Sequence, residues 1–189
     1  MSILRMGGAE IVINQKGISL MEVLVTVLVL GIGLLGVAAL QLTSLNANQE
    51  GYYRSQATEI AENLASKMRV AKNELYNGSS LLSDIVADYD STSTAFSCTA
   101  AATSCVDSVC TQAQRVAYDR WQVCDAAQND LPDGEVFVTV VNGIRARIAV
   151  AWTPTSARTD LGQVQVLNQR CTGLGVADTK DCVILEVIP

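Results

Sequence analysis

The chain has 189 residues, a formal net charge of −6 and no histidine. Its length predicts one domain with an appendage. The acidic balance, without clustered Lys and Arg, argues against a nucleic-acid partner, and the lack of histidine removes the commonest general base and metal ligand. No nucleophile–base pair, phosphate-binding glycine loop or paired-acid motif is present, so we expect no catalytic residues and no cofactor.

Residues 1–17 are expected to form a short cytoplasmic leader. They carry Arg5 and Lys16 against one acid, Glu10, and they lack the apolar centre of a secretory signal peptide. The two positive charges fit the excess of Lys and Arg on the cytoplasmic side of membrane segments.

An apolar helix follows, and we expect its transmembrane half to span residues 18–41. Within Val23–Leu40 the only polar side chain is Thr26, and this run spans roughly 27 Å, close to a hydrocarbon core. A buried helix of a soluble protein is disfavoured, because no comparable apolar segment exists elsewhere to cover it. Three glycines within the run (Gly31, Gly33 and Gly36) fit either close helix packing or local unwinding.

The helix is expected to continue without a break as an amphipathic half over residues 42–77. Apolar residues recur there at spacings of three and four, which predicts one buried stripe. The stripe consists of Ala57, Ile60, Ala61, Leu64, Met68, Ala71 and Leu75. Asn77-Gly78 supplies a stop signal, so one helix is predicted from about Ile18 to Tyr76.

Residues 78–189 are predicted to form a globular head. Residues 78–110 form a connection with at most short elements, and a helix is expected over 111–129 with Val116, Ala117, Trp121 and Cys124 on one side. After the turn at Pro132, period-two patterns predict strands over 135–141, 144–152, 162–167 and 182–188, with a hairpin at Asn142-Gly143. The fold class is therefore α+β: a long N-terminal helix packed on a small antiparallel sheet of about four strands. Trp121 and Trp152 are expected in the core, and Arg145 and Arg147 on a solvated strand face.

Six cysteines lie in the head, and a membrane segment that implies export of the head favours disulfides. Cys171 and Cys182 bracket the loop before the last strand and are expected to pair. The other four (Cys98, Cys105, Cys110 and Cys124) allow three pairings, which stay open, although sequence proximity favours Cys98–Cys105 with Cys110–Cys124. Zinc is disfavoured because Cys-x-x-Cys and histidine are absent. The acidic group Asp84, Asp88 and Asp90 lacks EF-hand spacing, so no metal site is expected.

The run Lys16-Gly17-Ile18-Ser19-Leu20-Met21-Glu22 resembles the class III leader junction of type IV prepilins and type II secretion pseudopilins, with Ile18 where Phe is usual. Residues 27–41 and 61–69 are similar to PilV-type minor pilins, the second run following the pattern Ala-x-x-Leu-Ala-x-x-Met-Arg. Residues 119–121, 131–134 and 150–152 resemble weaker sequence markers of that family's head domain.

The resemblance implies that the inner-membrane prepilin peptidase cuts between Gly17 and Ile18 and methylates the new amino group of Ile18. It also implies a single-pass inner-membrane protein with a periplasmic head that later enters an extracellular pilus. There, at or near the tip, it would join other minor and major pilins, a tip adhesin and the inner-membrane assembly machinery. The alternative is a minor pseudopilin of a type II secretion system.

Glu22 is a carboxylate in a segment destined for lipid, where a charge at the bilayer centre costs on the order of 2.5–3.5 kcal/mol. A new N-terminus at Ile18 lies about 6 Å away along the helix, and a neighbouring subunit's N-terminus could take its place in an assembly. The resemblance favours this assembly role over a Glu22 that only reaches back to the cytoplasmic interface.

Overall fold

The computed structural model describes residues 17–75, 82–91, 93–101, 103–154 and 169–189. The chain divides into two compact units, Met1–Leu42 and Thr43–Pro189. Three expected features lie outside the described residues: the leader up to Lys16, the helix stop at Asn77-Gly78 and the strand over 162–167.

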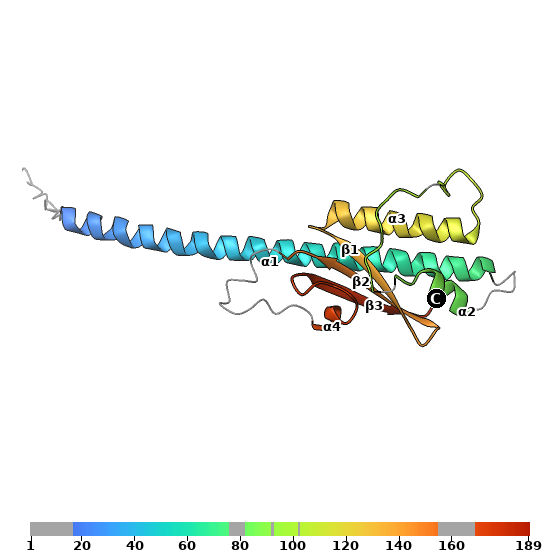
Figure 1. The fold of residues 1–189 in the computed structure, drawn as a ribbon. Helices are drawn as coiled ribbons and strands as arrows, with labels where there is room; N and C mark the ends of the chain where they lie inside the picture. Colours follow the sequence, from blue (N-terminus) through green and yellow to red (C-terminus); the bar gives the residue numbers. More distant parts are fainter. Residues whose placement is uncertain (1–16, 76–81, 92, 102, 155–168) are drawn as a thin grey trace, which may run out of the picture. The chain divides into compact units, whose positions relative to one another are not determined.

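The elements follow one another in the order α1, α2, α3, β1, β2, α4, β3 (Figure 1). Helix α1 (Leu20–Leu75) begins two residues after Ile18 and is continuous across the predicted apolar and amphipathic halves. The second long helix is α3 (Gln112–Asp130), and the helices α2 (Leu82–Asp88) and α4 (Gln169–Thr172) are short. The α+β prediction is confirmed.

Helix α3 begins and ends where its local sequence dictates. The Thr111 hydroxyl accepts from the Gln114 N–H while the Gln114 side chain accepts from the Thr111 N–H, which forms a capping box. At the other end, Leu131 donates to the Ala127 carbonyl, and a Cβ on Gly134 would lie 2.0 Å from that same oxygen. Only glycine fits at position 134, so the chain turns there directly into the sheet.

Three antiparallel strands form one sheet in the order β1-β2-β3: β1 (Glu135–Val141), β2 (Arg145–Trp152) and β3 (Asp181–Val187). The predicted Asn142-Gly143 hairpin joins β1 to β2, with both residues at positive φ (55° and 71°). Three strands rather than about four are found among the described residues, because the expected strand over 162–167 lies outside them.

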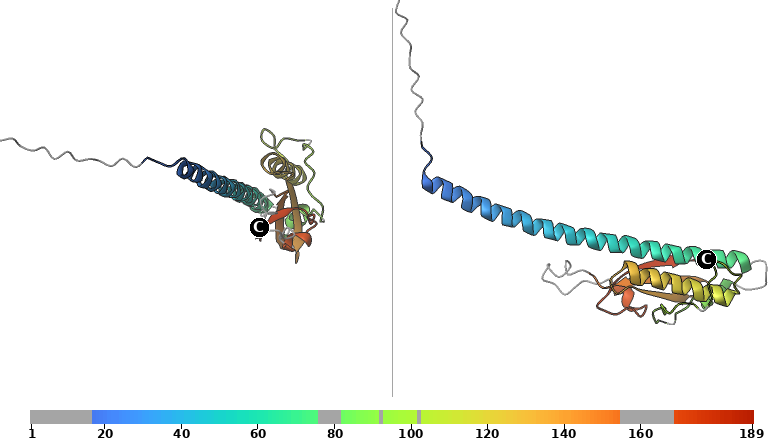
Figure 2. Two further views of the ribbon diagram at one scale, coloured as in Figure 1. Left: turned by 90° about the vertical axis from the view of Figure 1, so that its left-hand side faces the viewer. Right: turned by 90° about the horizontal axis from the view of Figure 1, so that it is seen from above.

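The main core lies between the sheet and the part of α1 beyond Thr43, and α3 lies beside this part of α1 (Figure 2). Six of the seven predicted stripe residues are buried there, from Ala57 to Ala71, together with Ala65. Their partners on the sheet are alternate residues of each strand, as a period of two requires: Val136 and Val138 of β1, Ala146, Ile148, Val150 and Trp152 of β2, and Val187 of β3.

The opposite face of the sheet is also covered, which the sequence pattern did not predict. Phe137, Ala149 and Ala151 are buried there under the segment that runs from α4 to β3. That segment supplies the apolar side chains Cys171, Leu174 and Val176. Strand β2 is therefore a two-sided central strand, with small alanines where the second layer lies close to it.

Candidate processing and assembly site

Gly17 and Ile18 lie in non-helical backbone immediately before α1, and both are exposed. Helical hydrogen bonding starts with the Ser19 carbonyl, which accepts from the N–H groups of Glu22 and Val23 at 2.9 and 3.3 Å. A processing enzyme that needs an extended, accessible peptide bond would find the Gly17–Ile18 bond outside the helix.

Glu22 lies in the first turn of α1 and its side chain is exposed. Among the described residues, no cation lies within ion-pair distance of its carboxylate. A carboxylate near a helix N-terminus is favoured by the helix dipole, which is a modest local effect. With residues 1–17 in place, a full counter-charge for Glu22 has to come from outside the described residues or from another molecule.

From Ile18 to Leu45 every large apolar side chain of α1 is exposed, with exposed fractions between 48 and 77%. An 18-residue window here has a mean hydropathy of 2.8 and none of it is buried, so length and composition suit a membrane crossing. Thr26, the one polar side chain within Val23–Leu40, donates to the Val23 carbonyl at 2.8 Å. That bond satisfies the hydroxyl inside the helix, as an apolar solvent requires.

Two family profiles match consecutive parts of the chain. The profile described as the prokaryotic N-terminal methylation motif matches residues 13–38, and the one described as type IV pilin Tt1218 matches residues 39–121. The chain is a type IV pilin with a class III leader. No curated protein and no solved structure shows significant similarity to it.

Membership of this family makes the pilin a structural protein and not an enzyme. Its leader implies processing by a prepilin peptidase and assembly with pilins, and the apolar helix with this leader fits an inner-membrane-anchored subunit that later joins a pilus. Among the described residues, no group of three or more Cys, Asp and Glu side chains is placed to hold a metal ion.

A polar bridge joins α1 and α3 to the turn that follows α2. Asp119 of α3 is buried; one of its oxygens lies 3.1 Å from the Lys67 ammonium of α1, and the other accepts from the Tyr89 hydroxyl at 2.7 Å. Lys67 also donates to Gln122. Burial, followed by the charge of Asp119 and its hydrogen bond, raises the pKa of Tyr89 well above its ordinary value.

The sequence did not identify this bridge as a unit. Lys67 does not belong to the predicted apolar stripe, and the resemblance over residues 119–121 gives no partner for Asp119. The available signal was the position of Asp119 on the α3 face that also holds Val116 and Val123, since a carboxylate on an apolar face requires a partner.

Three disulfides tie the head together: Cys98–Cys124, Cys105–Cys110 and Cys171–Cys182, with Cα–Cα distances of 5.1, 5.6 and 6.2 Å. The pairing of Cys98 with Cys105 and Cys110 with Cys124, favoured by proximity alone, was wrong. Cys124 lies on the buried face of α3, three residues before buried Ala127, and it meets Cys98 in the loop that also supplies buried Phe96. Side-chain direction on the helix, rather than sequence distance, decides the pairing.

Two further expectations for the head need correction, and one pair behaves as expected. Ala117 is exposed and Trp121 is only half-buried, its ring packed against Tyr118 with centroids 5.4 Å apart. Trp152 lies in the core. Arg145 and Arg147 lie on a half-exposed strand face and share Glu186, at 2.9 and 3.5 Å.

Proposed function

We propose that the chain is a minor pilin that is cut between Gly17 and Ile18, methylated at Ile18 and built into a type IV pilus at or near its tip. In this proposal residues 1–17 are removed, residues 18–41 cross the inner membrane, residues 42–77 form the amphipathic helix half, and residues 78–189 form a periplasmic head. Other minor and major pilins, the assembly machinery and a tip adhesin are its partners.

The observation that carries the proposal is that an exposed carboxylate, Glu22, lies at the start of an apolar helix segment whose side chains are also exposed. Glu22 lies one helical turn from the residue that becomes the N-terminus after cleavage. In low dielectric, a free ammonium group and a carboxylate attract strongly, so each subunit's Ile18 can be aligned with a carboxylate of the growing filament. The minor-pilin assignment rests on the likeness of residues 27–41 and 61–69 to PilV-type sequences.

N-terminal sequencing of the mature protein tests the processing step, and it should start at a methylated Ile18. Glu22→Gln and Glu22→Val should leave membrane insertion intact and strongly reduce recovery of the protein in sheared pili. Thr26→Val is the matched control, because it removes the other polar side chain of the run and should be incorporated normally. Normal incorporation of both Glu22 variants would contradict the assembly role.

Deletion of the gene separates the pilus from the alternative, a minor pseudopilin of a type II secretion system. We expect reduced piliation and twitching motility with normal secretion of exoproteins. Lost secretion with normal pili would replace the minor-pilin proposal by the pseudopilin one.

A further inference from the structure

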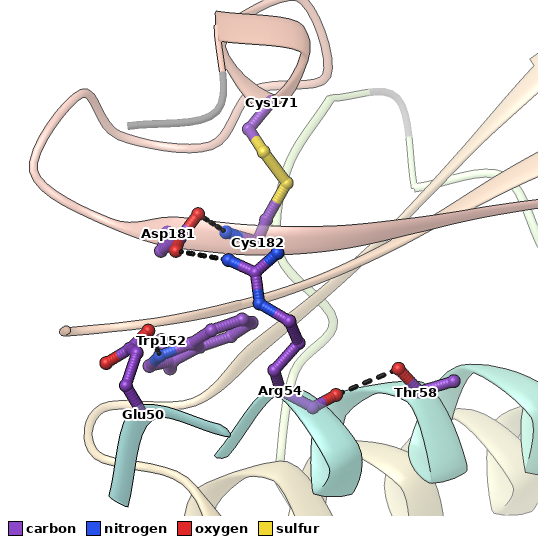
Figure 3. Close-up of polar contacts among 7 residues, drawn as sticks. All are labelled: Glu50, Arg54, Thr58, Trp152, Cys171, Asp181 and Cys182. Carbon is purple, nitrogen blue, oxygen red and sulfur yellow. Dashed lines mark hydrogen bonds and ion pairs between the residues drawn. A yellow bond between two sulfur atoms is a disulfide. The ribbon is translucent and has the colours of Figure 1, made fainter. Parts of the chain in front are cut away.

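Two consecutive turns of α1 hold the sheet through polar side chains. The indole N–H of Trp152 donates to the Glu50 carboxylate at 3.2 Å, and Arg54, four residues further along α1, donates to Asp181 at 3.0 Å (Figure 3). Trp152 and Asp181 are direct register partners on β2 and β3. The two contacts therefore join α1 to one cross-strand pair of the sheet. We call the four residues the clasp: Glu50, Arg54, Trp152 and Asp181.

Asp181 is held in place for this contact from its other side. Its second carboxylate oxygen accepts from the backbone N–H of Cys182 at 2.9 Å, and Cys182 is joined to Cys171. The Asp181 side chain is 1% exposed, whereas that of Arg54 is 49% exposed. The sheet side of the clasp is thus fixed and buried, as is Glu50 on the helix side, whereas Arg54 is open to solvent.

The helix residues of the clasp, Glu50 and Arg54, lie in a part of α1 that buries few apolar side chains. Among residues 43–56, all of which the structure describes, Glu50 is the only buried residue, and Tyr53 packs only part of its ring against the core. From Ala57 to Ala71, by contrast, every buried residue of α1 is apolar. Gly51, within the clasp segment, weakens the helix further, because glycine has low helix propensity.

We propose that residues 43–56 form a releasable segment of α1, held to the sheet mainly by the clasp and able to separate from it while residues 57–71 stay packed. Cooperative units with little apolar contact open with lower free energy than the core. Under the proposed function, which supplies its purpose, release lets the helix change its angle at the head when the subunit leaves the bilayer for the filament.

Hydrogen exchange of the full chain in detergent micelles, read by mass spectrometry, tests the release directly. Amides of 46–56 should exchange at least about tenfold faster than those of 60–71, because the lost protection reports local opening. Trp152→Phe and Arg54→Gln should each accelerate exchange in 46–56 by about five- to tenfold, which is the effect expected for one hydrogen bond to a charged group after solvent screening. Exchange in 60–71 should not change.

Gly51→Ala changes exchange in the opposite direction and guards against variants that simply misfold. No atom lies within 4 Å of the position that its Cβ would take, and the gain in helix propensity should slow exchange in 46–56 about fivefold. Arg69→Gln, an exposed change on the packed half of α1, is the matched control and should alter neither segment.

Two results would overturn the release. One is equal protection of the two segments in the wild type. The other is variants that accelerate both segments together, since the clasp would then be part of the global fold. This readout needs no pilus, so it is independent of the Glu22 assay: failure of that assay would remove the proposed purpose of the segment, not its release.

Discussion

Helix α1 carries two glutamates, and the comparison between them shows how one helix serves two environments. Glu22 is exposed among exposed apolar side chains, while Glu50 is buried and accepts from the Trp152 indole. The surroundings that α1 requires change between these two residues. The apolar side chains near Glu22 need lipid or other helices around them, whereas those beyond Glu50 pack against the sheet. The difference teaches that the first half of α1 depends on a partner molecule, whereas the second half is completed within its own chain.

The largest expected effect separates the two halves of α1 by core deletion. Leu64 is fully buried and Leu35 is exposed on the apolar half. Leu64→Ala should lower the free energy of unfolding of the head by about 3 kcal/mol through lost burial and a cavity. Leu35→Ala should leave it unchanged. Urea unfolding of the full chain in micelles, followed by the fluorescence of the head's Trp121 and Trp152, measures both, and equal losses would contradict the division of the helix.

The buried bridge should have the next largest effect. Asp119→Ala leaves Lys67 and Tyr89 without their shared partner, and we expect a loss of about 2 kcal/mol, reduced from the range for buried pairs because Lys67 is partly exposed. Asp125→Ala is the matched control on the same helix: Asp125 is exposed, and its carboxylate accepts a hydrogen bond from the side chain of Asn129, one turn further along α3. That change should fall within about 0.5 kcal/mol. A harmless Asp119→Ala would show that the bridge does not hold α3 to α1.

The contrast along α1 was largely predictable from the sequence. Residues 23–40 are apolar on all sides of the helix, as a segment surrounded by lipid or other helices requires. From Ala57 to Ala71 the apolar residues recur every three or four positions, as a helix with one buried face requires. The hairpin at Asn142-Gly143 was equally readable, because few residues tolerate two positive φ angles in succession.

The polar contacts were not predictable, because each joins segments that are distant in sequence. The partners Glu50–Trp152 and Arg54–Asp181 are 102 and 127 residues apart. No local pattern encodes such a pair, and the same limit applies to Cys98 and Cys124, 26 residues apart. The sequence also did not predict that the segment from α4 to β3 covers the second face of β2. Alanines such as Ala149 and Ala151 occur on solvated strand faces and on tightly packed ones alike.

Alkaline pH isolates the contribution of Tyr89 to the packed half. Burial and Asp119 raise the pKa of Tyr89 above the value near 10 that it has in the unfolded chain. Its contribution is therefore fully present below about pH 10 and is lost as pH rises through the folded-state pKa, by up to about 1.4 kcal/mol per pH unit. Tyr89→Phe should abolish this slope in urea unfolding, whereas Tyr118→Phe should retain it. An unchanged slope in Tyr89→Phe would contradict the assignment.

The smallest effect is expected for a contact that does not involve α1. Lys180 lies at 2.7 Å from Asp133 and 2.9 Å from Glu135, at the turn before β1. The hydrogen bond from Lys180 and its charge lower the pKa of Asp133, so this stabilisation is present above the unfolded-state pKa near 3.9 and is lost as pH falls through the lower folded-state value. Because Asp133 is largely exposed, solvent screens the pair and the effect should be slight. Asp133→Asn should flatten the acid limb of the stability curve slightly, and Asp130→Asn, exposed at the end of α3, should not. If Asp133→Asn destabilised the head as much as Leu64→Ala, the turn before β1, and not the packing of α1, would control the stability of the head.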